Sequence, residues 1–238
     1  MSGKANTVTP VLEASALRKG DIVSFGFYRN PAENAGIPLE WLVLEVSHGS
    51  PEDNSGASAS EVSGGKEAFL VARYALAFRR LHQGGMVNWK DCELRAWLNG
   101  AFLEESFSPE ERKLIKVSRL DNKEHPRWDP EADTAGAEYP KDREFCPATL
   151  DRVFLLSSAE TERYFESVSS RLCKAAPFVS QRTCRLEDGY GGVWWWLRSP
   201  GASAMLGATV ADEGLIDDGA YTGSIGGVRP ALRIKLPA

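Results

Sequence analysis

The chain has 238 residues, enough for one large domain or two small ones. Its 42% hydrophobic and 26% charged residues are typical of a globular protein, and no apolar run is long enough to cross a membrane, so we expect no membrane insertion. A net charge of −5 argues against a general binder of nucleic acid, which needs a basic face. Residues 1–6 are polar and lack the apolar core of a classical export signal.

The N-terminal third predicts a hairpin followed by an insertion. Residues 1–20 are mostly polar and are expected to be a lead-in. Alternating apolar residues over 23–27 and a buried-type run over 41–46 predict two antiparallel strands. Segment 47–66 consists largely of Gly, Ser, Ala and acidic residues, and strand character resumes at 69–71. We therefore expect 47–66 to be a flexible insertion rather than a linker between domains.

Two helices are expected in the next stretch. Apolar residues recur with helical spacing over 93–102, with Asp91 as the expected N-cap and Trp97 on the apolar stripe that should enter the core. The sequence Ser108-Pro109-Glu110-Glu111 has the form of a capping box with proline at the first helical position. It predicts a second helix that ends near Val117.

A second insertion and a third helix follow. Segment 121–148 is charged, rich in proline and aperiodic, so we expect a long surface loop. Residues 153–156 form an apolar run typical of a buried strand. Ser157 and Glu160 then predict a capped helix that continues to about Val168. Strands and helices in this order predict an α+β fold, with helices packed on a small antiparallel sheet.

The C-terminal stretch has two apolar blocks separated by a Gly-rich segment. Residues 194–201 read Trp-Trp-Trp-Leu-Arg-Ser-Pro-Gly, and residues 227–232 read Gly-Val-Arg-Pro-Ala-Leu. At least two of the three tryptophans, including Trp196, should be buried, and the period of two over 228–236 predicts a strand. We expect the arginine in each block to stack on an aromatic ring or to pair with a buried carboxylate or carbonyl.

These two blocks resemble an uncharacterised family of bacterial and phage domains. Pieces at 94–99, 107–111 and 153–157 resemble the same family, so the resemblance covers most of the chain from about Ile22. In many members the segment between the blocks is diversified by a retroelement. The resemblance implies one C-type-lectin-like domain over 21–238, related to the formylglycine-generating enzymes, with two or three packed helices and the mutable side chains on one exposed face. Because the N-terminus lacks a classical export signal, we expect a cytoplasmic or phage-particle-associated location.

The resemblance implies a non-enzymatic recognition protein whose variable surface lies on 202–225. The expected ligand is a protein or a cell-surface structure, held by a few apolar anchors among small and polar neighbours. The sequence leaves the oligomeric state open. The expected ligand-binding residues share positions between the two blocks: Ala202, Ser203, Met205, Leu206, Ala211, Asp212, Leu215, Asp217, Ala220, Tyr221, Gly223, Ser224 and Ile225.

Signs of chemistry are sparse. No two of the four cysteines have C-x-x-C spacing, and the three histidines have no cysteine or carboxylate at ligand spacing, so we expect neither metal nor cofactor. The carboxylates of Asp212, Asp217 and Asp218 lie beside glycines, where acidic residues favour turns; weak Ca²⁺ binding is the alternative. Two rival functions stay open: an oxidoreductase of the formylglycine-generating type, which a reactive pair of Cys173 and Cys184 would favour, and a structural module of a phage or bacterial assembly.

Overall fold

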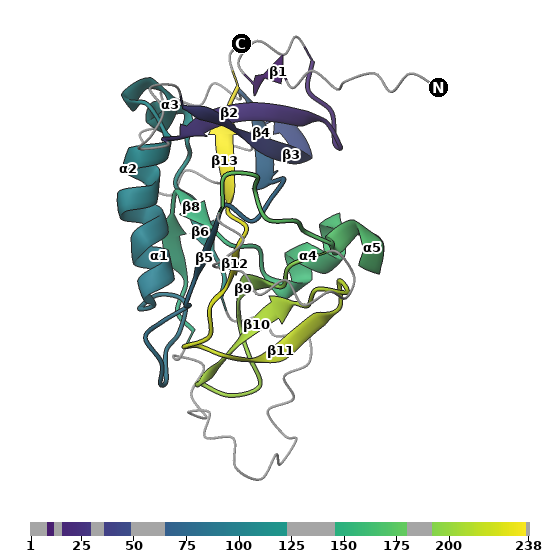
Figure 1. Cartoon of the computed structure of the whole chain (residues 1–238). Helices are drawn as coiled ribbons and strands as arrows, with labels where there is room; N and C mark the ends of the chain where they lie inside the picture. Colours follow the sequence, from purple (N-terminus) through teal and green to yellow (C-terminus); the bar gives the residue numbers. More distant parts are fainter. Residues whose placement is uncertain are drawn as a thin grey trace.

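The computed structural model gives an α+β fold of small, mostly antiparallel sheets with a few short helices, which confirms the expected fold class (Figure 1). Within the described ranges, no helix is both long and apolar enough to span a membrane. The expected insertions lie mostly in segments 49–64 and 123–145, which are outside the described residues. The structure describes residues 9–11, 16–29, 36–48, 65–122, 146–179 and 192–236.

The larger sheet joins the beginning of the chain to its end. Its strand order is β1-β2-β3-β4-β13-β8, and every pair is antiparallel except β1 with β2. The two strands predicted at 23–27 and 41–46 are present in β2 and β3, which pair as expected. The bounds are Thr9–Pro10 for β1, Ile22–Tyr28 for β2, Ile37–His48 for β3, Lys66–Ala72 for β4, Val153–Phe154 for β8 and Ala231–Lys235 for β13.

A second sheet has the order β11-β10-β9-β12-β5 and is antiparallel except where β12 meets β9. A third sheet consists of β6 and β7, which pair on either side of the predicted loop at 121–148 and flank it directly. The bounds are Ala77–Arg79 for β5, Ser118–Leu120 for β6, Thr149–Asp151 for β7, Trp195–Pro200 for β9, Leu206–Val210 for β10, Ile216–Tyr221 for β11 and Gly226–Val228 for β12.

The lead-in takes part in the fold more than its polarity suggested. β1 pairs in parallel with β2, with Thr9 opposite Val23. Val11 follows directly and is buried in the core. A short apolar piece inside a polar stretch was therefore overlooked, because three residues are too few to display a period.

The helix predicted at 93–102 is three short pieces. They are α1 (Glu93–Trp97), the π-helical segment η3 (Leu98–Phe102) and α2 (Leu103–Ser106). Gly100 has φ −112° and ψ −106°, and this non-helical conformation marks the kink. The cap is Cys92, whose sulfur accepts from the Arg95 N–H, so the expected cap at Asp91 was wrong by one residue.

The two predicted capping boxes are both present. Ser108 begins α3 (Pro109–Leu114) and Ser157 begins α4 (Ser158–Tyr164), each bonded reciprocally to a glutamate three residues on. Both helices end sooner than predicted. α3 stops before Ile115, which forms a bridge to Ile234, and a separate helix α5 (Val168–Arg171) follows α4.

The strand predicted over 228–236 is divided between two sheets. β12 belongs to the five-stranded sheet and β13 to the six-stranded sheet. Pro230 lies between them, where it has no amide proton to give to either ladder. The carbonyl of Pro230 still accepts from the Ala72 N–H, at 2.7 Å. This crossing ties the two sheets into one core.

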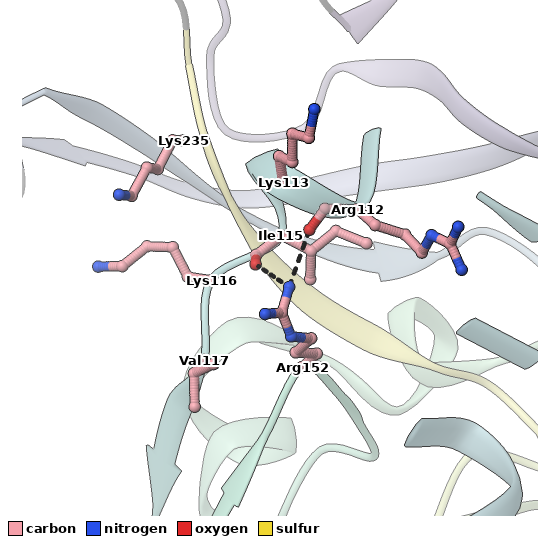
Figure 2. Close-up of a pocket in the computed structure, with 7 residues that line it drawn as sticks. All are labelled: Arg112, Lys113, Ile115, Lys116, Val117, Arg152 and Lys235. Carbon is pink, nitrogen blue, oxygen red and sulfur yellow. Dashed lines mark hydrogen bonds between the residues drawn. The ribbon is translucent and has the colours of Figure 1, made fainter. Parts of the chain in front are cut away.

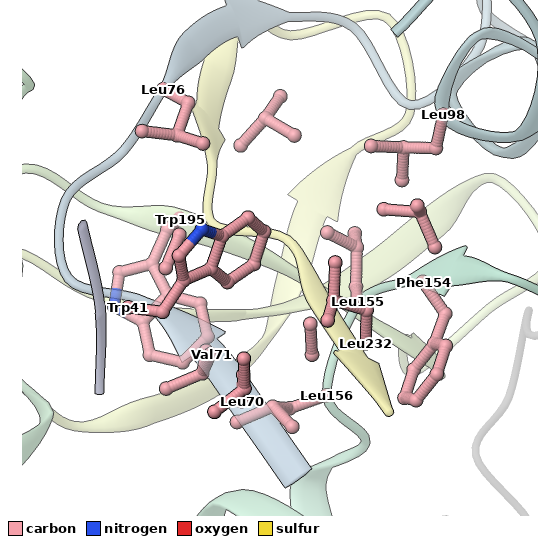
Figure 3. Close-up of a cluster of buried hydrophobic side chains, with 14 of the residues drawn as sticks. Trp41, Leu70, Val71, Leu76, Leu98, Phe154, Leu155, Leu156, Trp195 and Leu232 are labelled. Carbon is pink, nitrogen blue, oxygen red and sulfur yellow. The ribbon is translucent and has the colours of Figure 1, made fainter. Parts of the chain in front are cut away.

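The core lies where the two sheets meet, and Figure 3 shows part of it, including Trp41, Leu232 and Trp195. Trp195 and Trp196 are completely buried, which confirms the prediction for the tryptophan run. Trp97 is only half-buried, so its assignment to the core was partly wrong. The guanidinium of Arg79 covers its ring, 4.5 Å from the ring centre.

Candidate functional site

The segment between the two C-terminal blocks forms the hairpin of β10 and β11. β10 pairs with β9 of the first block on one side and with β11 on the other. β11 is at the edge of its sheet, and the register shifts between Gly207 and Thr209. The rigid block therefore positions the hairpin, while one side of β11 is left without a neighbouring strand among the described residues.

None of the thirteen expected ligand-binding residues is buried. Six are exposed: Ala202, Met205, Leu215, Asp217, Tyr221 and Ile225. Seven are half-buried: Ser203, Leu206, Ala211, Asp212, Ala220, Gly223 and Ser224. Four large apolar side chains among them, Met205, Leu215, Tyr221 and Ile225, are each 45–50% exposed.

Other side chains of the same segment are buried, so the expectation that 202–225 is a surface throughout was too broad. Ala204, Ala208, Val210 and Thr222 are all in the interior. Thr222 also donates its hydroxyl to the Gly85 carbonyl, at 2.9 Å. The hairpin is therefore two-sided: one set of residues attaches it to the core, and the other set is presented outward.

The exposed residues gather at the two ends of the hairpin. At one end, Tyr221 lies across from Leu206, and the Thr222 N–H donates to the Met205 carbonyl at 3.0 Å. The chain near Met86 joins this end, because the Val87 N–H donates to the Ala204 carbonyl at 3.0 Å. Met86 is 56% exposed and adds to the apolar surface. Met86 was not predicted as part of this surface. The residues next to it in the sequence give no sign that it lies beside a segment more than a hundred residues later.

The other end of the hairpin adjoins α5. Gly214 has φ +92°, and a Cβ there would collide with the backbone of Val168. Leu215 and Val168 are both exposed. This second apolar group is smaller. Val168, expected near the end of the third helix, begins the separate helix α5 instead.

One acidic residue of the hairpin, Asp217, holds its own backbone in a turn. Asp217 accepts from the backbone N–H of Gly219 through Oδ1 at 2.7 Å, as in an Asx turn. Within the described part of the chain, no group of three His, Cys, Asp or Glu side chains is placed to hold a metal ion. Weak calcium binding at Asp212, Asp217 and Asp218 stays a prediction.

The two block arginines have the structural roles predicted for them. Arg198 pairs with Glu160, donates to the Leu155 carbonyl at 2.8 Å and lies over Phe154. Arg229 lies 5.0 Å from the centre of the Trp195 ring and donates Nε to the Ala72 carbonyl at 2.9 Å. Its burial lowers the pKa of the Arg229 guanidinium. Both arginines brace the blocks from inside.

The described thiols are placed for packing. Burial raises the pKa of Cys92 to about 12 and that of Cys146 to about 11, and it also raises the pKa of Cys173. Since the thiolate is the reactive form, these three groups are poor nucleophiles near neutral pH. Cys184, the partner in the reactive pair considered above, lies outside the described residues.

The arrangement defines an α+β domain whose C-terminal hairpin is anchored by two buried blocks. The chain belongs to the family described as Domain of unknown function (DUF6273), whose profile matches residues 66–236. This agrees with the resemblance to an uncharacterised domain family, and both C-terminal blocks lie inside the matched range. β1, β2 and β3 precede it, so the match begins later than the resemblance suggested. Neither the curated proteins nor the solved structures gave a match to the chain.

Proposed function

We propose that this protein is a non-enzymatic recognition domain that presents the hairpin of β10 and β11 to a macromolecular ligand. The fold would be a variant of the C-type-lectin-like fold, in which a braced scaffold carries a variable segment. The ligand is a protein or a protein-bearing cell-surface structure, because the exposed hairpin residues are apolar anchors among small and polar neighbours.

The observation that carries the proposal is the division of the hairpin into anchored and exposed residues. Met205, Tyr221 and Ile225 expose large apolar side chains, whereas Ala208 and Val210 of the same hairpin are completely buried. An exposed apolar group on a rigid support is typical of interaction surfaces. Side chains in the exposed set can change without disturbing the core, as a diversified binding surface requires.

Photocrosslinking tests the proposal directly. A benzophenone amino acid at position 221 should crosslink to a partner in extracts of the native host, and the product should weaken when Met205→Ser and Ile225→Ser are added. The matched control carries the same group at Lys174, which is exposed and lies outside the hairpin. Equal products from both positions, or a product that the two serine changes leave untouched, would reject the hairpin as the recognition surface.

Diversification by a retroelement has its own test in the neighbouring DNA. We expect a reverse-transcriptase gene beside a near-copy of the segment that encodes 194–236, with differences confined to adenine positions of the copy. Differences should concentrate in codons of the exposed hairpin residues and spare those of Trp195, Trp196 and Arg229. An intact locus without a near-copy would leave the recognition surface in place but remove the diversification.

A further inference from the structure

A basic pocket lies at the end of the molecule opposite the β10–β11 hairpin, where α3 meets the last residues of β13 (Figures 1 and 2). Its volume is about 440 Å³. The lining contains basic and apolar side chains and no acidic one, in a chain whose net charge is −5. It consists of Arg112, Lys113, Ile115, Lys116, Val117, Arg152 and Lys235.

Arg152 is held in place at the base of this pocket. One terminal nitrogen donates to the Arg112 carbonyl at 2.9 Å and to the Ile115 carbonyl at 3.4 Å, as Figure 2 shows. These carbonyls are at the C-terminal end of α3, where a cation is favourable. Capping explains why an arginine is here. It does not explain why, among the described residues, no carboxylate pairs with its guanidinium.

The lysines add positive charge that is only partly balanced. Lys116 pairs with Glu67, and both side chains are largely buried. Lys113 and Lys235 are exposed and have no carboxylate partner among the described residues. In Figure 2, Lys116 and Lys235 extend to the same side, whereas the Lys113 ammonium and the Arg112 guanidinium point in other directions. Like charges that line one pocket repel one another, and a bound anion would reduce this repulsion.

More cationic side chains lie beyond this pocket. Arg233 and Lys235 are two residues apart on β13 and therefore lie on the same face of the strand. Arg233 lines a second pocket of about 390 Å³ together with Arg119 and Arg163, and the carboxylates of Asp121 and Glu160 also line it. The walls of this second pocket also include Ser118 and Arg198, whose buried Oγ and Nε atoms have no hydrogen-bond partner among the described residues. Such groups are costly to leave unsatisfied.

We propose that the pocket of Lys113, Arg152 and Lys235 binds a small phosphorylated ligand that carries at least two negative charges. An anchored guanidinium flanked by lysines suits phosphate oxygens, which accept several charge-assisted hydrogen bonds at once. Salt screens electrostatic attraction beyond roughly 8 Å at physiological ionic strength. A small anion in the pocket is therefore attracted by the nearby cations and is little repelled by the net negative charge of the rest of the protein. Nucleic acid fits less well, because the lining offers no aromatic ring for stacking.

Calorimetric titration of the full chain with pyrophosphate tests this site independently of the hairpin. We expect saturable 1:1 binding in about 0.15 M salt, near the physiological ionic strength. Lys113→Gln with Lys235→Gln should weaken it at least about tenfold, because the variant removes two positive charges from the pocket lining. Both side chains are exposed, so the variant should fold normally, which its thermal unfolding will verify.

The matched control is Lys90→Gln with Lys174→Gln, which removes the same charge from exposed positions outside the pocket. It should leave pyrophosphate affinity within about twofold of the parent, as expected for distant charges under screening. If both variants weaken pyrophosphate binding equally, the effect comes from the net charge of the protein, and the proposal is overturned. A lack of saturable pyrophosphate binding would also overturn it, as would tighter binding of a single-stranded oligonucleotide that the pocket variant abolishes.

Discussion

The two C-terminal blocks and the hairpin between them are neighbours in the sequence but have opposite relations to solvent. β9 is almost wholly buried, and its arginine is enclosed by an aromatic ring, a carbonyl and a carboxylate. β11 alternates between exposed and half-buried residues and lies at a sheet edge. The difference teaches that a backbone can be fixed from one side by buried neighbours while its other side is left free to vary.

The largest expected effect comes from Trp196→Ala in the first block. The ring is completely buried, packs edge-on against Trp194 with centroids 5.0 Å apart, and donates Nε1–H to the Arg79 carbonyl at 3.0 Å. Its loss leaves a large cavity, so the free energy of unfolding should fall by about 3–5 kcal/mol in a urea titration. Unchanged stability with altered binding would make this tryptophan part of the ligand surface and erase the distinction between block and hairpin.

A pair of glycine substitutions tests the same distinction at the level of single methyl groups. In Gly226→Ala the new Cβ would collide with the ring of Trp194 and lie 2.7 Å from Trp196 Nε1, so both indoles must shift. We expect a loss of about 1–3 kcal/mol. Gly219→Ala on β11 meets only the flexible carboxylate of Asp217, at 3.2 Å, and should stay within about 0.5 kcal/mol of the parent. Similar losses in thermal or urea unfolding would contradict the comparison.

Thiol labelling compares the interior with the hairpin kinetically. At pH 8, iodoacetamide should modify Tyr221→Cys quickly, because that position is exposed, while Cys92 and Cys173 stay unmodified until the protein unfolds. Peptide mass spectrometry identifies each site. Rapid modification of Cys173 in the folded protein would show that the segment around Cys173 opens readily, which would contradict a rigid interior.

The raised thiol pKa values also predict a loss of stability in alkaline solution. Cys92 has a pKa of about 12 in the folded protein against an ordinary value of 9.0, so the unfolded chain loses its proton first. Its contribution is complete below pH 9 and is lost between about pH 9 and 12, at no more than about 1.4 kcal/mol per pH unit. Cys92→Ala should flatten this slope in urea titrations at a series of pH values; an unchanged slope would assign it to other groups.

Local signals in the sequence predicted the parts of this fold that depend on local chemistry. The capping boxes at Ser108 and Ser157 are present as expected, because each needs only a hydroxyl and a carboxylate three residues apart. The division of the last strand at Pro230 was missed. The alternation of apolar and polar residues looks the same whether the segment forms one strand or two strands in different sheets. Met86 was missed for a related reason: its exposure depends on long-range pairing, which composition does not encode.

The smallest expected effects concern the exposed side chains of the hairpin. Met205→Ser, Leu215→Ser, Tyr221→Ser and Ile225→Ser, made singly, should each change the free energy of unfolding by less than about 0.5 kcal/mol, because each parent side chain is already 45–50% exposed. Val210→Ser is the matched control. It lies in the same hairpin but is completely buried, so it should cost about 2 kcal/mol or more through lost packing and a buried hydroxyl. If the four exposed changes cost as much as the control, the hairpin belongs to the core and the reason for proposing it as a recognition surface is gone.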